Sequence, residues 1–211
     1  MTALPGPPLS KAVAPDPGVE LLERALGYTR STLATVTPAH LCLPTPCERW
    51  RLADLLAHME DSLDAFAEGA GGRISLHSAA PAPLDERIGS LQAKACNLLG
   101  AWAAATTSQV EVGGRPVPVG TISRLAAVEI AVHGWDVGRT TGAGDPMPEE
   151  FAEALLPTAL ALALEQHGEF GPPVPVPADA GSERRMLALL GRASRRAARR
   201  TARDAGRGPA R

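Results

Sequence analysis

Apolar residues recur every three or four positions along most of this chain, which is the period of an amphipathic α-helix. Residues 19–36 follow this pattern, and Pro38 ends the segment. The next segment opens with Thr45 and Pro46, a capping residue followed by proline at the first helical position, and runs to the glycine-rich break at residues 69–72. Its apolar positions keep the helical period: Leu52, Leu55, Leu56, Met59, Leu63 and Phe66. Two helices, each with one buried face, are therefore predicted in the first third of the chain.

The rest of the chain predicts four more helices and one short extended segment. Apolar spacing predicts a third helix that ends near Thr106, a fourth over residues 122–139, a fifth over 149–166 and a last one over 182–201. Pro157 is expected to kink or break the fifth helix, because proline lacks the backbone N–H that the helix uses. Residues 110–120 alternate around Gly113 and Gly114, which predicts a short hairpin or an extended loop.

These elements indicate an all-α protein with four main helices, further helices toward the C-terminus and a short extended segment. The connection over residues 69–84 is longer than neighbouring antiparallel helices need, so we expect it to cross over. Five prolines in residues 1–17 predict a disordered leader. The bundle is expected to occupy residues 18–192, followed by an Arg-rich tail over 193–211 that we expect to be disordered.

Composition supports a globular, helical chain. Apolar residues make up 45% and charged residues 21%, while aromatic residues are only 3%, so the core is expected to consist of leucine, alanine and valine. The three cysteines form no CxxC pair, and the first residues contain no apolar run typical of a secretory signal. The longest apolar stretch, residues 154–164, is too short to span a bilayer. We therefore expect a cytoplasmic protein without a membrane partner, either a monomer or a homodimer.

Charge changes this picture only at the C-terminal end. The net charge is −2, yet residues 192–211 contain eight arginines and one aspartate. Such a tail could contact nucleic acid or an acidic surface. Arg-rich chain ends that are merely solvated are more common than ends that bind nucleic acid, so we do not expect a nucleic-acid partner.

The residues most informative about chemistry lie on the fourth predicted helix. Glu129, His133 and Asp136 fall within the apolar stripe that Ile122 and Val132 define. Burying ionisable groups without partners is costly, and a bound metal ion compensates this cost. Glu129 and His133 are four residues apart, so their side chains project side by side and suit a shared ion.

A third ligand has to come from another helix. Among the four histidines other than His133, only His58 lies in the interior of a predicted helix, at the flank of its apolar stripe. Two imidazoles and one carboxylate leave positions on a metal open for water or substrate, which is typical of a catalytic site. The alternative is that Glu129 and His133 form an ordinary surface pair, and that His58 is a core histidine with satisfied hydrogen bonds.

Four neighbouring residues are assigned smaller roles. Asp136 is expected to orient a ligand imidazole from behind, although it could also bind the ion or pair with Arg139. Arg139 is expected either to bind a substrate carboxylate or to complement the C-terminal end of its helix. Cys47, at the predicted helix start, is a candidate nucleophile or fourth ligand. Trp135 faces away from the metal side and is expected to pack.

Three motifs carry a resemblance to a known family. LPTPCERWRLADLLAHM at 43–59, VEIAVHGWDVGRTTG at 128–142, and FGPPVPVPADA followed by MLALLGR at 170–192 resemble the actinobacterial metal-binding proteins related to mycothiol-dependent maleylpyruvate isomerase, within the DinB/YfiT-like superfamily. The resemblance covers about residues 18–192. It implies a DinB-like four-helix bundle with an up-down-down-up course, and a divalent ion, usually zinc, bound by His58, Glu129 and His133. It also implies a thiol co-substrate, mycothiol or bacillithiol, whose sulfur binds the metal as thiolate and then adds to an electrophile.

The resulting hypothesis is a metal-dependent, thiol-dependent transferase or isomerase that acts on a small electrophilic metabolite. The alternatives are a non-catalytic metal-binding bundle that senses or carries a ligand, and an accessory protein whose arginine tail binds nucleic acid. The ligand set suits zinc, but it also suits nickel, iron, copper or manganese.

Overall fold

The computed structural model describes residues 16–47, 50–74, 82–165 and 170–192, and every structural statement below refers to these ranges. The expected arginine tail, most of the expected leader and the centre of the 69–84 connection lie outside them. No helix within these ranges is long and apolar enough to cross a membrane.

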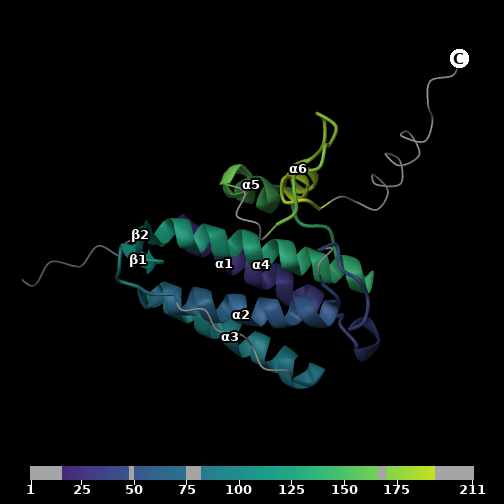
Figure 1. Cartoon of the computed structure of the whole chain (residues 1–211), viewed down its shortest axis with the longest axis horizontal. Coiled ribbons are helices and arrows are strands. Elements are labelled where there is room, and N and C mark those ends of the chain that lie inside the picture. Colours follow the sequence, from purple (N-terminus) through teal and green to yellow (C-terminus); the bar gives the residue numbers. More distant parts are fainter. Residues whose placement is uncertain (1–15, 48–49, 75–81, 166–169, 193–211) are drawn as a thin grey trace, which may run out of the picture.

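Helices make up most of the described chain (Figure 1). The first half contains α1 (Pro17–Leu33), the 3-10 helix η1 (Pro38–His40), α2 (Leu52–Ala70) and α3 (Leu84–Ala104). The second half contains strands β1 (Gln109–Val112) and β2 (Arg115–Pro118), followed by α4 (Val119–Thr141), α5 (Glu149–Glu165) and α6 (Ser182–Leu189). The strands pair antiparallel, and Gly113 and Gly114 at the turn are left-handed, with φ of 57° and 79°. The all-α prediction is confirmed, and the alternating segment forms a hairpin over 109–118 rather than a loop, while residues 119 and 120 already belong to α4.

Helices α1 to α4 form a four-helix bundle, and α5 and α6 pack outside it beside α4 (Figure 1). α1 packs along α4 and α2 along α3, while contacts of α2 with α4 and of α1 with α3 close the bundle. Apolar side chains from all four helices share one core, including Leu22, Leu55, Leu98 and Ala127. α4 is the central element, because residues 126–138 are buried without interruption.

Gly134 allows α1 and α4 to approach closely. A Cβ at this position would lie 2.3 Å from Thr29 Oγ1 and 3.1 Å from Thr29 Cα. The Thr29 hydroxyl donates a hydrogen bond to the Ile130 carbonyl (2.9 Å). Because Gly134 directly follows His133 in α4, this tight contact also fixes where His133 lies relative to α1.

The start of the second helix differs from the prediction. α2 begins at Leu52 with Arg51 as its N-cap residue, not at Thr45. The Thr45 hydroxyl donates to the carbonyls of Cys47 and Trp50, each at 2.9 Å, and so stabilises a loop. The capping prediction is therefore wrong, because this hydroxyl acts as a donor within the loop and does not accept from helical N–H groups.

The two C-terminal helices also differ from the prediction. α5 continues through Pro157 without a break; this proline lies on the exposed face, where water can satisfy the carbonyl that loses its helical partner. α6 ends at Leu189, and residues 193–201 of the predicted last helix lie outside the described ranges. Gly191 has a left-handed backbone (φ 76°), and the N–H groups of Gly191 and Arg192 donate to two carbonyls of the last helical turn (3.1 and 2.8 Å). This Schellman arrangement ends the helix.

Candidate metal centre

Three potential metal ligands converge where α2 meets α4. His58 Nε2 lies 2.7 Å from Glu129 Oε1, and His133 Nε2 lies 3.1 Å from the same oxygen. One potential ligand atom from each of the three residues lies within 4.8 Å of the others. The two imidazole rings stand edge to face, with centroids 5.0 Å apart. The structure thus brings together the three residues that the sequence predicts as ligands.

The local fold explains this convergence. Glu129 and His133 are one helical turn apart on α4, and their side chains are only 10% and 2% exposed. His58 lies at the edge of the apolar face of α2, and its side chain is 30% exposed. Because α2 packs against α4, this edge position directs the imidazole toward Glu129. Burial of this degree shows that Glu129 and His133 do not form a surface pair.

The site favours charged groups despite their burial. Burial by itself raises the pKa of Glu129, but the charge of His133 and hydrogen bonds with both imidazoles hold the pKa of this carboxyl well below its usual range. Burial also disfavours a charged His133, yet the Glu129 carboxylate and the hydrogen bond with Asp136 raise the pKa of His133 to about 9. The buried carboxylate therefore requires a positive charge beside it, which a metal cation can supply in place of the proton.

This donor set fits a divalent metal such as zinc. Imidazole nitrogens and carboxylate oxygens are common zinc ligands, and three of them leave a position of a tetrahedral ion open. The ring orientation fits as well, because His133 directs Nε2 to the site while its Nδ1 lies 3.1 Å from Asp136 Oδ2. A ligating histidine typically bonds its second ring nitrogen to a carboxylate in this way.

Asp136 and Arg192 support His133 from behind. Asp136 is fully buried, and its Oδ2 accepts hydrogen bonds from Nη2 and Nε of Arg192 (2.9 and 3.3 Å). Arg192 also donates from Nη1 to the Leu190 carbonyl (2.8 Å). Asp136 therefore pairs with Arg192 and His133, and not with Arg139. These contacts connect α4 to the segment that follows α6.

Two aromatic rings from loops cover the histidines. The centroid of the Trp50 ring lies 4.3 Å from that of His58 and 5.9 Å from that of His133. Phe170 stacks on His133 with centroids 6.1 Å apart, and the Arg192 guanidinium lies 5.0 Å from the Phe170 centroid. Neither spacing nor residue type marks Trp50, Phe170 or Arg192 as functional in the sequence. Their one signal in the sequence is that all three lie within the motifs that carry the family resemblance.

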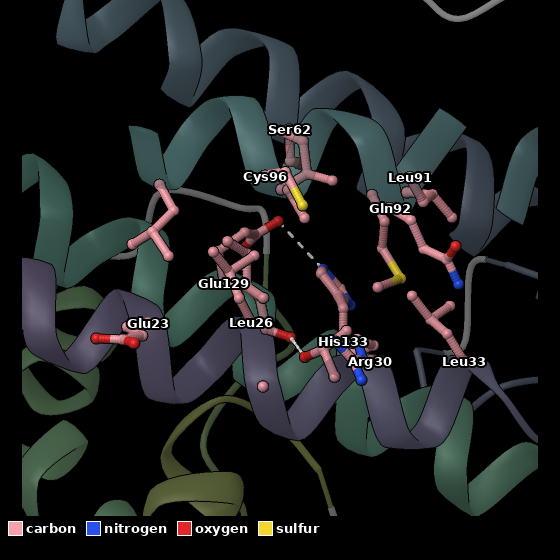
Figure 2. A pocket seen from close by; sticks show the side chains of 17 residues that line it. Glu23, Leu26, Arg30, Leu33, Ser62, Leu91, Gln92, Cys96, Glu129 and His133 are labelled. Atoms are coloured by element: carbon pink, nitrogen blue, oxygen red, sulfur yellow. Dashed lines mark hydrogen bonds and ion pairs between the residues drawn. The ribbon is translucent and has the colours of Figure 1, made fainter. Parts of the chain in front are cut away.

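A cavity of about 600 Å³ extends from Glu129 and His133 into the space between α1, α2 and α3 (Figure 2). Its volume is within the range of small-molecule sites, about 300–1,000 Å³. Most of its lining is apolar and comes from all four helices of the bundle: Leu26, Leu33, Met59, Leu63, Leu91, Leu99 and Ile130. The candidate metal centre therefore borders a space that a small organic molecule can occupy.

The remaining candidates lie at varying distance from this site. Arg139 lines a separate hollow of about 260 Å³ beside α6, and its guanidinium lies 5.6 Å from the Trp135 ring centroid. Trp135 donates a hydrogen bond to Glu183 of α6 (3.1 Å), so it packs away from the candidate ligands. Cys47 is buried, but it precedes α2 and does not stand at its N-terminus. Cys96, for which the sequence predicts no role, lines the cavity.

Comparison with known sequences identifies relatives of this chain. The family described as mycothiol maleylpyruvate isomerase N-terminal domain matches residues 22–138, a range that contains all three candidate ligands. Two uncharacterized proteins of Mycobacterium tuberculosis, MT0763 of strain CDC 1551 / Oshkosh and Rv0738 of strain ATCC 25618 / H37Rv, are each 28% identical to this chain over 181 residues. Each alignment covers 82% of this chain and 96% of the relative.

Two solved structures share the fold. A crystal structure of a mutant of the mycothiol-dependent maleylpyruvate isomerase aligns with a TM-score of 0.62 at 16% identity, over 83% of this chain and 88% of that chain. A second crystal structure of that isomerase aligns with a TM-score of 0.51 at 19% identity, over 69% and 68% of the two chains. The DinB-like fold class predicted from the sequence is confirmed. Because the family match spans more than half of its length, this chain belongs to the family of the mycothiol maleylpyruvate isomerase N-terminal domain.

Proposed function

We propose that this protein is a metal-dependent enzyme that uses mycothiol, or a related low-molecular-weight thiol, in a transferase or isomerase reaction on a small electrophilic substrate. The observation that carries the proposal is the convergence of His58, Glu129 and His133 beside a cavity of about 600 Å³. Membership of a family named for a mycothiol-dependent isomerase supports the choice of thiol.

Each part of the site has a role in this proposal. His58, Glu129 and His133 would hold the ion, for which we propose zinc; when bound it supplies a positive charge that stabilises a thiolate or polarises a carbonyl oxygen at neutral pH. Asp136 keeps the His133 ring turned so that Nε2 faces the site. Trp50 covers the histidines on one side, and the apolar cavity holds the substrate and excludes water on the other.

Elemental analysis of the purified protein tests the metal site. We expect an equimolar divalent ion in the wild type, and its loss in His58→Ala and in His133→Ala. His40→Ala is the matched control, because His40 lies in η1, outside the cluster of candidate ligands. Wild-type protein that neither contains nor takes up zinc would refute the proposal.

Turnover separates an enzyme from a metal-binding carrier. The metal-loaded wild type is incubated with a panel of small electrophiles, with and without mycothiol, and conversion of the electrophile is followed. We expect conversion that requires both mycothiol and His133. A fully loaded protein that binds these compounds but converts none of them would favour the carrier.

A further inference from the structure

One wall of the cavity is a single face of α1. Six residues of α1 line the cavity and follow one another at intervals of one to three positions: Glu23, Leu26, Gly27, Thr29, Arg30 and Leu33. Figure 2 shows the labelled members of this set along α1, facing Ser62, Leu91 and Cys96 of α2 and α3 across the cavity. Charge and space along the α1 face therefore determine which molecules fit beside the candidate metal centre.

Arg30 places an uncompensated positive charge at this apolar cavity. The side chain is exposed, and no carboxylate within the described part of the chain pairs with its guanidinium. The cavity-lining residues one turn to either side, Leu26 and Leu33, are apolar. Glu23 is seven residues away, a rise of about 10 Å along the helix, which is too far for an ion pair within α1. A guanidinium in this position is suited to bind a carboxylate in bidentate fashion.

Gly27 leaves space beside Arg30. Glycine in the interior of a helix is destabilising relative to alanine, so its presence calls for a reason. At Gly134 the reason is close packing, but a Cβ at Gly27 would meet no heavy atom within 4 Å. The absence of a side chain at Gly27 leaves part of the cavity open, one turn before Arg30.

We propose that the α1 wall selects substrates with one carboxylate on an apolar body. Arg30 binds the carboxylate, and Gly27 and the leucines accommodate the apolar body. Glu23 also lines the cavity and is not one of the proposed ligands, so a second carboxylate on the substrate would meet its negative charge. This inference rests on the proposed function, because it takes the cavity beside the three ligands as the substrate site. It assigns to Arg30 the carboxylate contact that the sequence suggests for Arg139.

Calorimetric titration of the metal-loaded protein with three probes tests this inference. Octanoate carries one carboxylate, 1-octanol none and octanedioate two. We expect octanoate to bind more tightly than either other probe, and Arg30→Gln to weaken octanoate binding about tenfold or more without changing 1-octanol binding. Arg24→Gln is the matched control, since Arg24 lies on the same helix with its guanidinium 4.9 Å from the Phe151 ring centroid and does not line the cavity. This variant should bind octanoate like the wild type.

Gly27→Leu tests the space requirement with the same probes. The leucine side chain would enter the cavity, so we expect loss of octanoate and 1-octanol binding with unchanged metal content. Three results would overturn the inference. The wild type does not bind octanoate, Arg30→Gln binds octanoate as tightly as the wild type, or the wild type binds octanedioate more tightly than octanoate. Metal content measured on the same samples keeps the two ideas distinct: a loaded protein with unselective binding contradicts only the role of α1, whereas a protein that takes up no metal contradicts the proposed function.

Discussion

Gly134→Ala is expected to destabilise the protein although alanine is the better helix former. The substitution gains about 1 kcal/mol of helix propensity. Its Cβ, however, would lie 2.3 Å from Thr29 Oγ1 and 3.1 Å from Thr29 Cα, so α1 and α4 have to move apart. Overpacking of this kind costs about 1–3 kcal/mol, and the strained hydrogen bond from Thr29 to Ile130 adds about 1 kcal/mol. The net loss in the free energy of unfolding is about 1–3 kcal/mol.

Urea unfolding of Gly134→Ala beside Gly27→Ala measures this balance. Gly27 lies in the interior of α1 and has no neighbour within 4 Å of a built Cβ, so its variant keeps the propensity gain and should be up to about 1 kcal/mol more stable than the wild type. The two variants should therefore differ by about 2–4 kcal/mol. Because Gly134 follows His133, we also expect lower metal content in Gly134→Ala alone. Equal midpoints for the two variants would refute the packing argument.

Two further predictions concern charged groups. Arg192→Gln removes the cation that pairs with the buried Asp136, so we expect zinc affinity to fall about 10- to 100-fold, as measured by competition with a chelator. Arg185 lies on the exposed face of α6, so the control variant Arg185→Gln should bind zinc like the wild type. Glu60 lies 2.6 Å from Arg87 Nη1 and 3.2 Å from Lys94 Nζ, and although burial raises its pKa, hydrogen bonds and these charges lower the pKa overall. A carboxyl with a lowered pKa contributes stability above its ordinary pKa near 4.3 and loses it as the pH falls further, so the stability difference between wild type and Glu60→Gln should shrink below about pH 4. A difference that stays constant with pH would contradict this assignment.

The candidate ligand set could be predicted because it depends on the periodicity of two helices. Because of their spacing, Glu129 and His133 lie on the same buried face of α4, whatever conformation the neighbouring loops adopt. His58 could be chosen because it is the one histidine besides His133 that the sequence places in a helix interior. The distances among the three residues follow from the packing of α2 against α4, which spacing within each helix does not determine.

The surroundings of the site could not be predicted in this way. Trp50 and Phe170 come from loops, where no period relates a residue to a face, and both reach the histidines only through tertiary packing. The capping prediction at Thr45 fails for a related reason. The capping signal depends only on neighbouring residues, whereas in the folded loop the hydroxyl donates to the Cys47 carbonyl. Arg30 lies in the last turn of α1, where a basic residue is expected in any helix, so only the position of the cavity distinguishes it.

The continuous burial of α4 explains why the site extends beyond the part of the chain that the family match covers. A buried helix has to pair its polar groups on every side. Glu129 is paired on the side of α2, and Asp136 on the side of the segment after α6. His133 takes part in both arrangements, because Nε2 faces Glu129 and Nδ1 faces Asp136. The orientation of the His133 ring therefore depends on Arg192, 54 residues beyond the end of the matched range at residue 138. The segment that follows α6, outside the bundle, thus contributes to the candidate centre inside it.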